Sequence, residues 1–541
     1  MNILSKNYPL EVTIQNMQNA LLSVDPKISF SKELHPLTNC YSINLSFDDA
    51  PTYIYTNGKG AISDASKASA LGEYIERLQT NNFFTEFYLP NRKFYPDEKL
   101  FEFGGEFLND KLHDIYNPNN ELDDRDYIDY NSDHIDKIVT LPFINLSDNQ
   151  TSYIPVNILH NLYASNGLAS GNNPKEAQVQ AISEIFERYV KTKIIKNGYS
   201  LPKFPQEIIS SFDKLDSDIK ELRQMGYIVE VLDASLGGVY PVCAISLIDP
   251  TTHTLFVSFG SHPILEVSLQ RTISELVQGR DLKSDQNFQT PTFDMSIVSN
   301  SFNLESHFID SNGKIGFPFL KNSADFIYTP WVYSGKDSED EFEFLVNITK
   351  SLDLDIYLRE YNYLDFYSCQ VLIPSLSEVY PIDDLVYNNT NVGKNLRDMV
   401  LSFKEYDPED ILDFIESFDD NLDIAKYIGV IFKNKFTILE FKIQLHLMLE
   451  NYTEAIELLS ISSDINSSSL EQLCYIYQDG HKWDEYEDAL YNLFGKDIIL
   501  NGVEIFNGQK EFIDITFDSE YLNILFFYDR VSLKKDSYYN P

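Results

Sequence analysis

Carboxylate side chains recur at helical spacing in three separate segments of the chain. The first segment reads KASALGEYIERL, and within it Ser69, Glu73 and Glu76 stand at positions i, i+4 and i+7. Residues at this spacing project from one face of a helix, and Arg77 follows directly after them. The sequence therefore predicts a helix that presents two acids and a hydroxyl on the same side.

The two later segments carry polar faces of the same kind. In SNGLASGNNPKEAQVQAISEIFERYV the polar residues stand at i, i+4, i+8 and i+11, and an arginine follows the last acid. In SLQRTISELVQGRDL an arginine and an acid stand four residues apart, and Gln278 and Arg280 follow. The residues concerned are Glu176, Gln180, Glu184, Glu187 and Arg188 in the second segment, and Arg271 and Glu275 in the third.

Each polar face taken alone has a simpler explanation, since Glu, Gln and Arg at helical spacing usually mark a solvated helix surface. Three such faces, embedded among Ala, Ser, Leu and Ile, indicate instead a cation that bridges like charges. Glutamates from different helices can hold Mg²⁺ and leave coordination positions for phosphate, while arginines hold the phosphates. The sequence thus predicts an ATP site without a P-loop, because neither GxxxxGK[ST] nor GxGxxG occurs.

Two glycine-bearing segments, TNGKGAISDASKAS and SNGLASGNN, precede the first two acidic helices. Both read as turns that lead into helices. For their glycines, ordinary turn chemistry and close approach of the backbone to a ligand are both open explanations. Lys59 in the first segment is either a phosphate contact or an ordinary exposed lysine.

Together the three segments resemble the signature motifs of the YcaO family, in the same order and within roughly residues 50 to 390. The resemblance implies that ATP binds between these helices together with Mg²⁺. It also implies nucleotide contacts from two residues near the N-terminus. The implied metal ligands are Glu73, Glu76, Glu176 and Glu187, and the other implied nucleotide-site residues are Lys6, Thr13, Ser69, Gln180, Glu184, Arg188, Arg271 and Glu275.

The same resemblance implies an ATP-dependent enzyme that activates a backbone amide of a peptide or protein. The chain ends in DSYYNP and departs from the proline-rich PxPxP tail of many family cyclodehydratases. This departure favours an accessory role in methylthiolation of a small-subunit ribosomal protein, with a radical methylthiotransferase as partner. One alternative is a peptide cyclodehydratase or thioamide-forming enzyme of a natural-product pathway. Another is a nucleotide-binding scaffold that acts through its helical C-terminus.

The elements that must position these residues change character along the chain. Short Val-, Ile-, Tyr- and Phe-rich segments alternate with helical patterns from Pro51 to about Ile382, whereas helical spacing dominates after about Thr390. We therefore expect an α/β (α+β) YcaO-type catalytic domain over residues 1–390 and an all-α domain over residues 391–541. NYTEAIELL and EYEDALYNL are offset by 34 residues, which is the tetratricopeptide period or a chance match of two amphipathic helices. The second domain is accordingly expected to be tetratricopeptide-like.

Composition sets the remaining expectations. The formal charge is −41, from 83 acidic and 42 basic side chains, so the surface repels phosphate backbones and anionic lipids. Neither nucleic acid nor a membrane is expected as a partner. The four cysteines lie far apart and no run of about 18 apolar residues occurs, which favours a cytoplasmic protein with reduced thiols. A short helical repeat leaves apolar faces that need cover, so a homodimer is expected.

Overall fold

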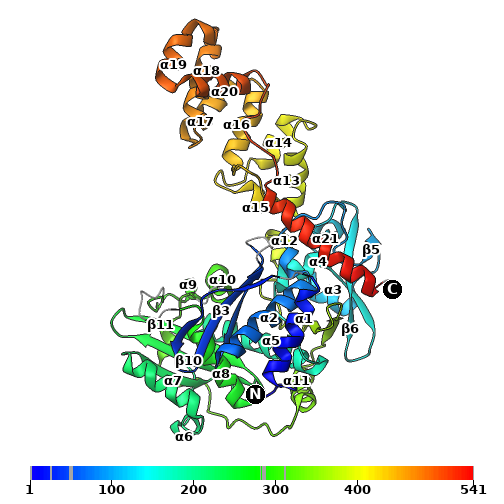
Figure 1. Cartoon of the computed structure of the whole chain (residues 1–541), viewed down its shortest axis with the longest axis vertical. Coiled ribbons are helices and arrows are strands. Elements are labelled where there is room, and N and C mark those ends of the chain that lie inside the picture. The colour runs from blue at the N-terminus through cyan, green and yellow to red at the C-terminus, as the bar shows by residue number, and fades with distance from the viewer. Residues whose placement is uncertain are drawn as a thin grey trace.

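The computed structural model describes residues 3–24, 27–47, 53–280, 282, 288–309 and 312–539 of the 541-residue chain. Figure 1 shows a broad α/β part and a narrower helical part that extends from one end of it. The expectation of a mixed α/β region followed by a helical region is confirmed.

Three antiparallel sheets form the framework of the α/β part in the described ranges. The largest sheet joins strands that are distant in sequence, in the order β5-β6-β12-β13-β8, with β7 paired to β6. The strands of the first sheet are β1 Ile28–Phe30, β2 Leu34–Leu37, β3 Cys40–Phe47 and β4 Tyr55–Gly60; those of the second are β9 Ile228–Asp233, β10 Val242–Asp249 and β11 Thr254–Ser261; those of the largest are β5 Lys99–Glu102, β6 Lys137–Asn145, β7 Thr151–Pro155, β8 Leu168–Gly171, β12 Tyr357–Tyr361 and β13 Tyr367–Leu372.

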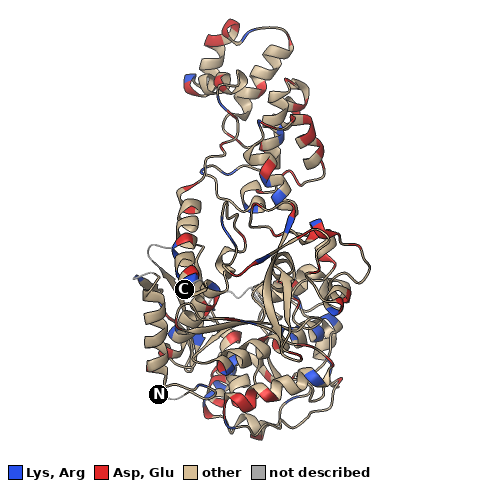
Figure 2. Ribbon diagram, turned by 90° about the vertical axis from the view of Figure 1, so that its right-hand side faces the viewer, with Lys and Arg blue, Asp and Glu red and all other residues tan. Residues whose placement is uncertain are grey.

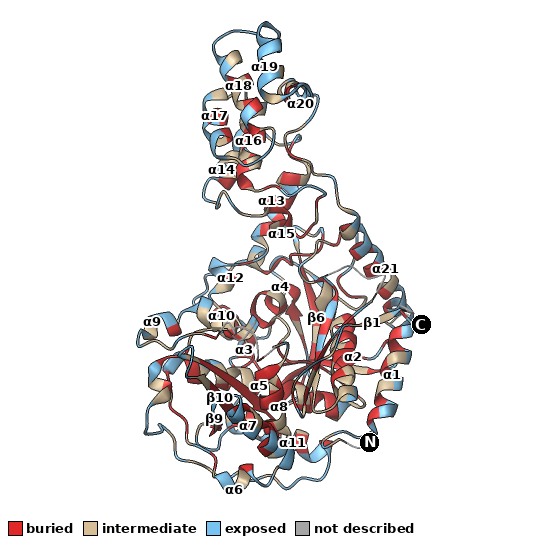
Figure 3. Cartoon of the chain, turned by 60° about the vertical axis from the view of Figure 1, so that its left-hand side comes forward, coloured by how far each residue is buried: buried red, intermediate tan, exposed pale blue. Residues whose placement is uncertain are grey.

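Helices pack on these sheets, and the buried residues gather between the two kinds of element (Figure 3). None of the helices in the described ranges is both long and apolar enough to cross a membrane. The helices of the α/β part are α1 Leu10–Leu22, α2 Ser63–Gln79, α3 Asp110–Tyr116, α4 Val156–Ile158, α5 Pro174–Asn197, α6 Gln206–Ile209, α7 Asp213–Gln224, α8 Leu265–Val277, α9 Met295–Val298, α10 Ser301–Ile309, α11 Ser338–Ser351 and α12 Asp384–Tyr387.

Both ends of helix α5 are encoded in the local sequence. The side chain of Asn173 accepts a hydrogen bond from the backbone N–H of Glu176 at 2.9 Å, and Pro174 occupies the first turn. At the other end Gly198 adopts the left-handed conformation with φ 64°. Each is a residue type preferred at its position, so the helix ends are well defined and the acidic face has a fixed direction.

Helix α2 lies directly on strand β4 because glycine occupies the point of closest approach. A Cβ atom on Gly58 would stand 2.0 Å from the carbonyl oxygen of Ser66 and 2.6 Å from the nitrogen of Ala70. The interpretation of TNGKG as a turn is therefore wrong, since these residues form part of a strand whose packing excludes a side chain. The SNGLASGNN segment likewise contains strand β8.

The C-terminal part is helical, and its tip has a small hydrophobic core of its own. The two sequences offset by 34 residues are packed differently there, because Ala455 is fully buried whereas Ala489 is exposed. The tetratricopeptide assignment stays a prediction. The helices of this part are α13 Val392–Leu401, α14 Pro408–Ile415, α15 Ile424–Ile428, α16 Ile438–Met448, α17 Tyr452–Ile461, α18 Ser467–Gln478, α19 Glu487–Phe494, α20 Lys496–Phe506 and α21 Ser519–Tyr539.

The last helix, α21, returns from the helical part to the α/β part (Figure 1). The hydroxyl of Tyr521 donates to the carbonyl oxygen of Tyr88 at 2.8 Å, and Arg92 forms an ion pair with Asp529 at 2.6 Å. One hydrophobic core consequently includes residues from α1, α2, α13, α15 and α21. The core thus crosses the position at which the sequence predicts a boundary between two domains.

Candidate functional site

A cleft of about 2250 Å³ opens beside helices α2, α5 and α8. Strand β8 contacts both α2 and α5, and strand β11 contacts both α5 and α8. The sheets thereby hold the three helices that carry the predicted polar faces around a shared space.

The residues that the resemblance assigns to metal and nucleotide all line this cleft. They come from four regions that are distant in the chain: the N-terminal segment with α1, and the helices α2, α5 and α8. The lining residues are Lys6, Thr13, Ser69, Glu73, Glu76, Glu176, Gln180, Glu184, Glu187, Arg188, Arg271 and Glu275. The predicted faces therefore converge, while the roles of these residues toward metal and nucleotide stay predictions.

Two of the acids pair with arginines one turn later on their own helices. Arg77 contacts Glu73 at 3.1 Å, and Arg188 contacts Glu184 at 2.7 Å. All four side chains are between 22% and 31% exposed, so the pairs lie in the wall of the cleft rather than inside the core. Each arginine can exchange its carboxylate for a phosphate, because guanidinium groups bind both with the same geometry.

Two further contacts join different elements across the cleft. Arg271 of α8 donates to the side chain of Gln180 of α5 and, at 3.1 Å, to the carbonyl oxygen of Ser261. Lys59 of β4 forms an ion pair with Glu275 of α8. Lys59, which the sequence left open, is thus a wall residue of the cleft. Burial lowers the pKa of its ammonium, while the nearby carboxylates of Glu187, Glu73 and Glu184 act in the opposite direction.

The carboxyl groups of Glu76 and Glu187 lie in surroundings that disfavour their ionised form. Burial raises the pKa of Glu76 well above its usual value, and the neighbouring Glu184 and Glu73 add to this against the opposing charge of Arg77. Burial also raises the pKa of Glu187, against the opposing charges of Lys59 and Arg188. Both carboxylates would be stabilised by an additional cation.

The donor set of the cleft fits Mg²⁺ bound together with phosphate. Oxygen ligands are what Mg²⁺ prefers, and it commonly takes only one or two carboxylates and fills its other positions with water and phosphate oxygens. In the part of the chain that the structure describes, no three His, Cys, Asp or Glu side chains are gathered closely enough to hold a metal by themselves. The carboxylates of the cleft are of the ligand type that Mg²⁺ prefers.

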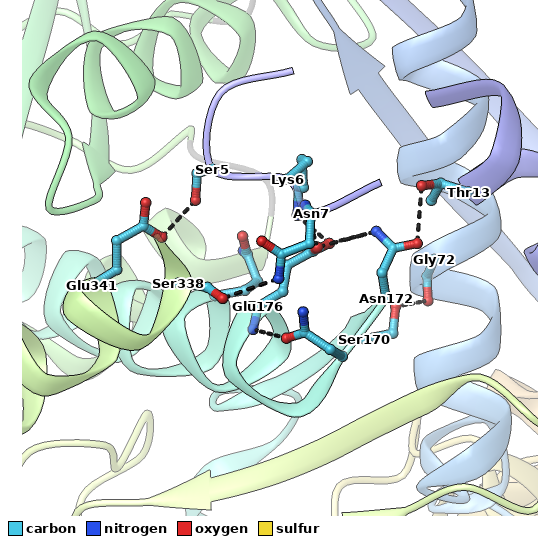
Figure 4. A network of polar contacts seen from close by, with 12 residues as sticks. Ser5, Lys6, Asn7, Thr13, Gly72, Ser170, Asn172, Glu176, Ser338 and Glu341 are labelled. Atoms are coloured by element: carbon cyan, nitrogen blue, oxygen red, sulfur yellow. Dashed lines mark hydrogen bonds and ion pairs between the residues drawn. The ribbon is translucent and has the colours of Figure 1, made fainter. Parts of the chain in front are cut away.

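Glu176 differs from the other predicted metal ligands because both of its oxygens already have partners. Lys6 donates to Oε1 at 3.1 Å, the backbone N–H of Asn7 donates to Oε2 at 3.3 Å, and Asn172 donates to both (Figure 4). Thr13 in turn donates to Asn172 at 2.9 Å. Burial alone would raise the pKa of Glu176, but Lys6 and Asn172 outweigh it and the pKa is lowered. Glu176 therefore ties the N-terminal segment to α5.

A second anchor for the N-terminal segment escaped the sequence reasoning. The hydroxyl of Ser5 donates to Glu341 at 2.7 Å (Figure 4) and lies 2.9 Å from Nε2 of His262. Nδ1 of His262 accepts from the backbone N–H of Ile264 at 3.0 Å, so Nε2 carries the proton and donates to Ser5. Burial and the charges of Arg271 and Lys6 lower the pKa of His262 well below its usual value, so the ring is neutral. This histidine cannot act as a base toward Ser5.

Nothing local in the sequence identifies this anchor. Glu341 stands in the run SEDEFEF, which reads as a solvated helix start, and His262 is a lone histidine. In the structure both are almost fully buried, with side-chain exposures of 2% and 0%.

Comparison with protein-family models gives two matches. Residues 57–377 match the YcaO cyclodehydratase model, described as ATP- and Mg²⁺-binding. Residues 393–529 match the model of the YcaO cyclodehydratase C-terminal domain.

Two relatives match over most of their length. An uncharacterized protein of Haemophilus influenzae is 38% identical over 493 residues, which are 86% of this chain and 83% of the relative. The ribosomal protein S12 methylthiotransferase accessory factor YcaO of Escherichia coli is 40% identical over 430 residues, which are 77% of this chain and 73% of the relative. Among solved structures, YcaO from Methanopyrus kandleri bound with AMPPCP and Mg²⁺ matches with a TM-score of 0.43 at 15% identity, covering 69% of this chain and 92% of the other.

Proposed function

Because this chain belongs to the YcaO family, whose domain binds ATP and Mg²⁺, we propose that it activates a backbone amide of a peptide or protein substrate at the cleft of α2, α5 and α8. The observation that supports this most directly is the convergence of the acidic and arginine-bearing faces of the three helices on one cleft.

One group of these residues is proposed to bind the metal, and a second group to bind the nucleotide. Glu73, Glu76 and Glu187 would bind Mg²⁺, and Glu176 would join them only if Lys6 moves from its oxygens to the nucleotide. The remaining polar side chains would contact the nucleotide, with the arginines opposite the phosphates. These are Lys6, Thr13, Ser69, Gln180, Glu184, Arg188, Arg271 and Glu275, and Lys59 joins them as an addition from the structure.

Bound ATP with Mg²⁺ would supply an electrophilic phosphorus that turns the amide oxygen into a leaving group. The chain's own residues would hold the reactants in line and balance charge. Arg77 and Arg188 can turn from Glu73 and Glu184 toward phosphate oxygens, which would release Glu73 for the metal and Glu184 for the nucleotide site.

For the biological role, the similarity to the Escherichia coli accessory factor favours support of ribosomal-protein methylthiolation, with a methylthiotransferase as partner. The proposed location is the cytoplasm, on the basis of the four widely spaced cysteines. Exposed apolar side chains on the helical tip, Ile461, Ile465 and Leu493, support association into a homodimer. The family model's description favours a second candidate, a peptide cyclodehydratase.

The test is nucleotide turnover by the purified chain with ATP and Mg²⁺, with and without excess chelator, and with the products identified by chromatography. Glu76→Gln and Glu187→Gln should each abolish turnover, because an amide is a poor Mg²⁺ ligand, while Glu457→Gln on the surface should leave it unchanged. Unchanged turnover in both cleft variants, with folding confirmed by thermal melting, would overturn the proposed metal ligands. ADP or AMP as the product would show which phosphate bond is cleaved.

A further inference from the structure

The cleft is larger than a nucleotide site needs. Pockets for small molecules are commonly about 300–1,000 Å³, whereas this cleft has a volume of about 2250 Å³. Beyond the acidic helices, its lining continues along α10, past residues 380–384, to the start of the helical part. In Figure 3, α12 lies between α10 and the start of the helical part. We call this region the outer cleft, and its central residues are Glu86, Phe302, Glu305, Phe308, Tyr380 and Asp384.

Aromatic rings connect the outer cleft to the proposed nucleotide site. The guanidinium of Arg188 lies 4.2 Å from the centre of the Phe308 ring. The Phe308 ring is in turn 6.4 Å from the ring of Tyr380, in an edge-to-face arrangement. Phe302, on the same helix as Phe308, is 78% exposed at the edge of the cleft. A ligand in the outer cleft would therefore lie against aromatic surface directly beside the proposed phosphate contacts.

Three carboxylates line the outer cleft together with Tyr380. Burial raises the pKa of its hydroxyl, and the negative charges of Glu305, Glu86 and Asp384 raise it further, which places all three acids near this ring. Within the described residues, neither Glu86 nor Glu305 has a side-chain hydrogen bond or an ion pair. Asp384 accepts a hydrogen bond from Asn388 at 2.7 Å, which leaves its charge unbalanced.

The end of the outer cleft nearest the helical part continues this charge. Asp419 and Asp423 line it, with Lys426 as the accompanying cation. Acidic residues are also distributed over the surfaces of both parts (Figure 2), and the whole chain carries a formal charge of −41. Unbalanced acids beside exposed aromatic faces suit lysine and arginine side chains, which bind carboxylates through ion pairs and rings through cation–π contacts.

We propose that the outer cleft binds a cationic segment of the peptide or protein substrate, so that lysine or arginine residues flanking the reacting amide determine which substrates are accepted. This inference rests on the proposed function, because it assumes that a polypeptide is modified at the inner end of the same cleft. The lining, which continues from the acidic helices to the start of the helical part, and its aromatic rings match an extended peptide. The net charge would also speed its association.

The test compares fluorescein-labelled peptides of equal length that carry lysine, glutamine or glutamate at the same positions in a Gly-Ser-Tyr background. Binding to the full chain is measured by fluorescence anisotropy at low and high salt. The lysine peptide should bind about tenfold more tightly than the glutamine peptide at low salt, and this preference should shrink as salt screens the charges. The glutamate peptide should bind most weakly.

Variants assign the preference to the outer cleft. The double variant Glu86→Gln and Glu305→Gln should lose most of the preference for lysine. A matched control, Glu416→Gln and Glu457→Gln, changes the net charge equally at exposed positions away from the cleft and should keep the preference. Melting temperatures show whether both variants are folded.

The outcomes separate this inference from the proposed function, because Mg·ATP turnover is measured on the same wild-type preparation. Equal affinity for the lysine and glutamine peptides in an enzyme that turns over ATP would overturn the inference alone. An equal loss of preference in both double variants would also overturn it, since net charge and not the outer cleft would be responsible. If the chain does not turn over ATP but still prefers the lysine peptide in a way that depends on Glu86 and Glu305, the outer cleft is supported as a binding site. That result would count against the proposed function.

Discussion

The carboxylates of the cleft differ in what balances their charge. Glu73 and Glu184 have arginines on their own helices, which can be withdrawn without moving the backbone. The side chain of Glu176 is 3% exposed, and its charge is balanced by Lys6. Lys6 lies in the N-terminal segment, so the local sequence of α5 does not reveal this pair. The arginines of the local pairs are thus available to bind a ligand instead. The Lys6–Glu176 pair also holds the N-terminal segment against α5.

Replacing Lys6 should therefore affect stability as well as nucleotide binding. Lys6→Met leaves Glu176 buried without a cation, at a cost on the order of 1–3 kcal/mol, since Asn172 and the Asn7 N–H still donate to it. Lys6→Met combined with Glu176→Gln should recover much of the stability without recovering ATP affinity. Thermal melting and nucleotide titration check the two effects separately.

If the double variant is no more stable than Lys6→Met alone, the ion pair does not account for the loss. Lys67→Met provides a control, because Lys67 pairs with the exposed Asp64. Its replacement should lower the melting temperature very little.

The polar residues that the sequence could identify by spacing are those that share one helix face with other polar residues one or two turns away. Their spacing follows directly from 3.6 residues per turn, and this is why the faces of α2, α5 and α8 were predicted residue by residue. The Ser5 anchor could not be predicted in this way. Ser5 and His262 are 257 positions apart, and Ser5 and Glu341 are 336 apart, so only the folded chain brings them together.

At the scale of elements, the position of α2 is set by how closely it approaches β4. The approach depends on a residue without Cβ at Gly58, where the added atom would meet backbone rather than a movable side chain. Sequence reasoning recognised these glycines but assigned them to a turn. The local sequence of a six-residue strand does not show which helix will pack on it. The regions of helix and strand were predictable, but this contact was not.

Gly58→Ala should consequently be severely destabilising, by about 3 kcal/mol or more, or should prevent folding. Gly72→Ala on α2 is the matched comparison. Its Cβ would stand 3.1 Å from the Ser170 hydroxyl and 3.3 Å from the end of the Met17 side chain, which can shift, and alanine favours the helix. Urea unfolding should show a large decrease in the free energy of unfolding for Gly58→Ala and little change for Gly72→Ala. Similar losses in both would mean that the contact with β4 is not the limiting one.

At the scale of the whole molecule, α21 joins the two parts of the chain. Near its end Lys535 is completely buried, donates to the side chain of Asn81, and lies 5.0 Å from the centre of the Tyr95 ring and 5.1 Å from that of Tyr528. Sequence reasoning placed this helix in a separate helical domain, because helical periodicity shows which face is apolar but not which part of the molecule that face will cover.

The docking of α21 should depend on pH through this lysine. Burial lowers the pKa of Lys535 from its ordinary 10.5 to about 7, against the opposing charge of Asp536. Between these values the unfolded chain binds a proton that the folded chain lacks, so stability rises with pH, by at most about 1.4 kcal/mol per unit. Relative to Lys535→Met, the wild type should therefore gain melting temperature from pH 7 to pH 9.

Lys534→Met is the matched control, because Lys534 is exposed on the same helix and its replacement should not alter the pH dependence. The same pH dependence in wild type and in Lys535→Met would mean that Lys535 keeps its proton when buried.

The return of α21 also bears on the order in which the protein is made. The core begins with α1 and α2, yet it is completed by residues of α21, from Tyr521 to Val531, which the ribosome adds last among its buried residues. At about 5–20 residues per second, translating from α13 to α21 takes on the order of ten seconds. For that time the part of the chain made before α13 presents an uncovered apolar surface. Its period of greatest exposure to aggregation, and its greatest need of a chaperone, therefore falls within translation rather than after it.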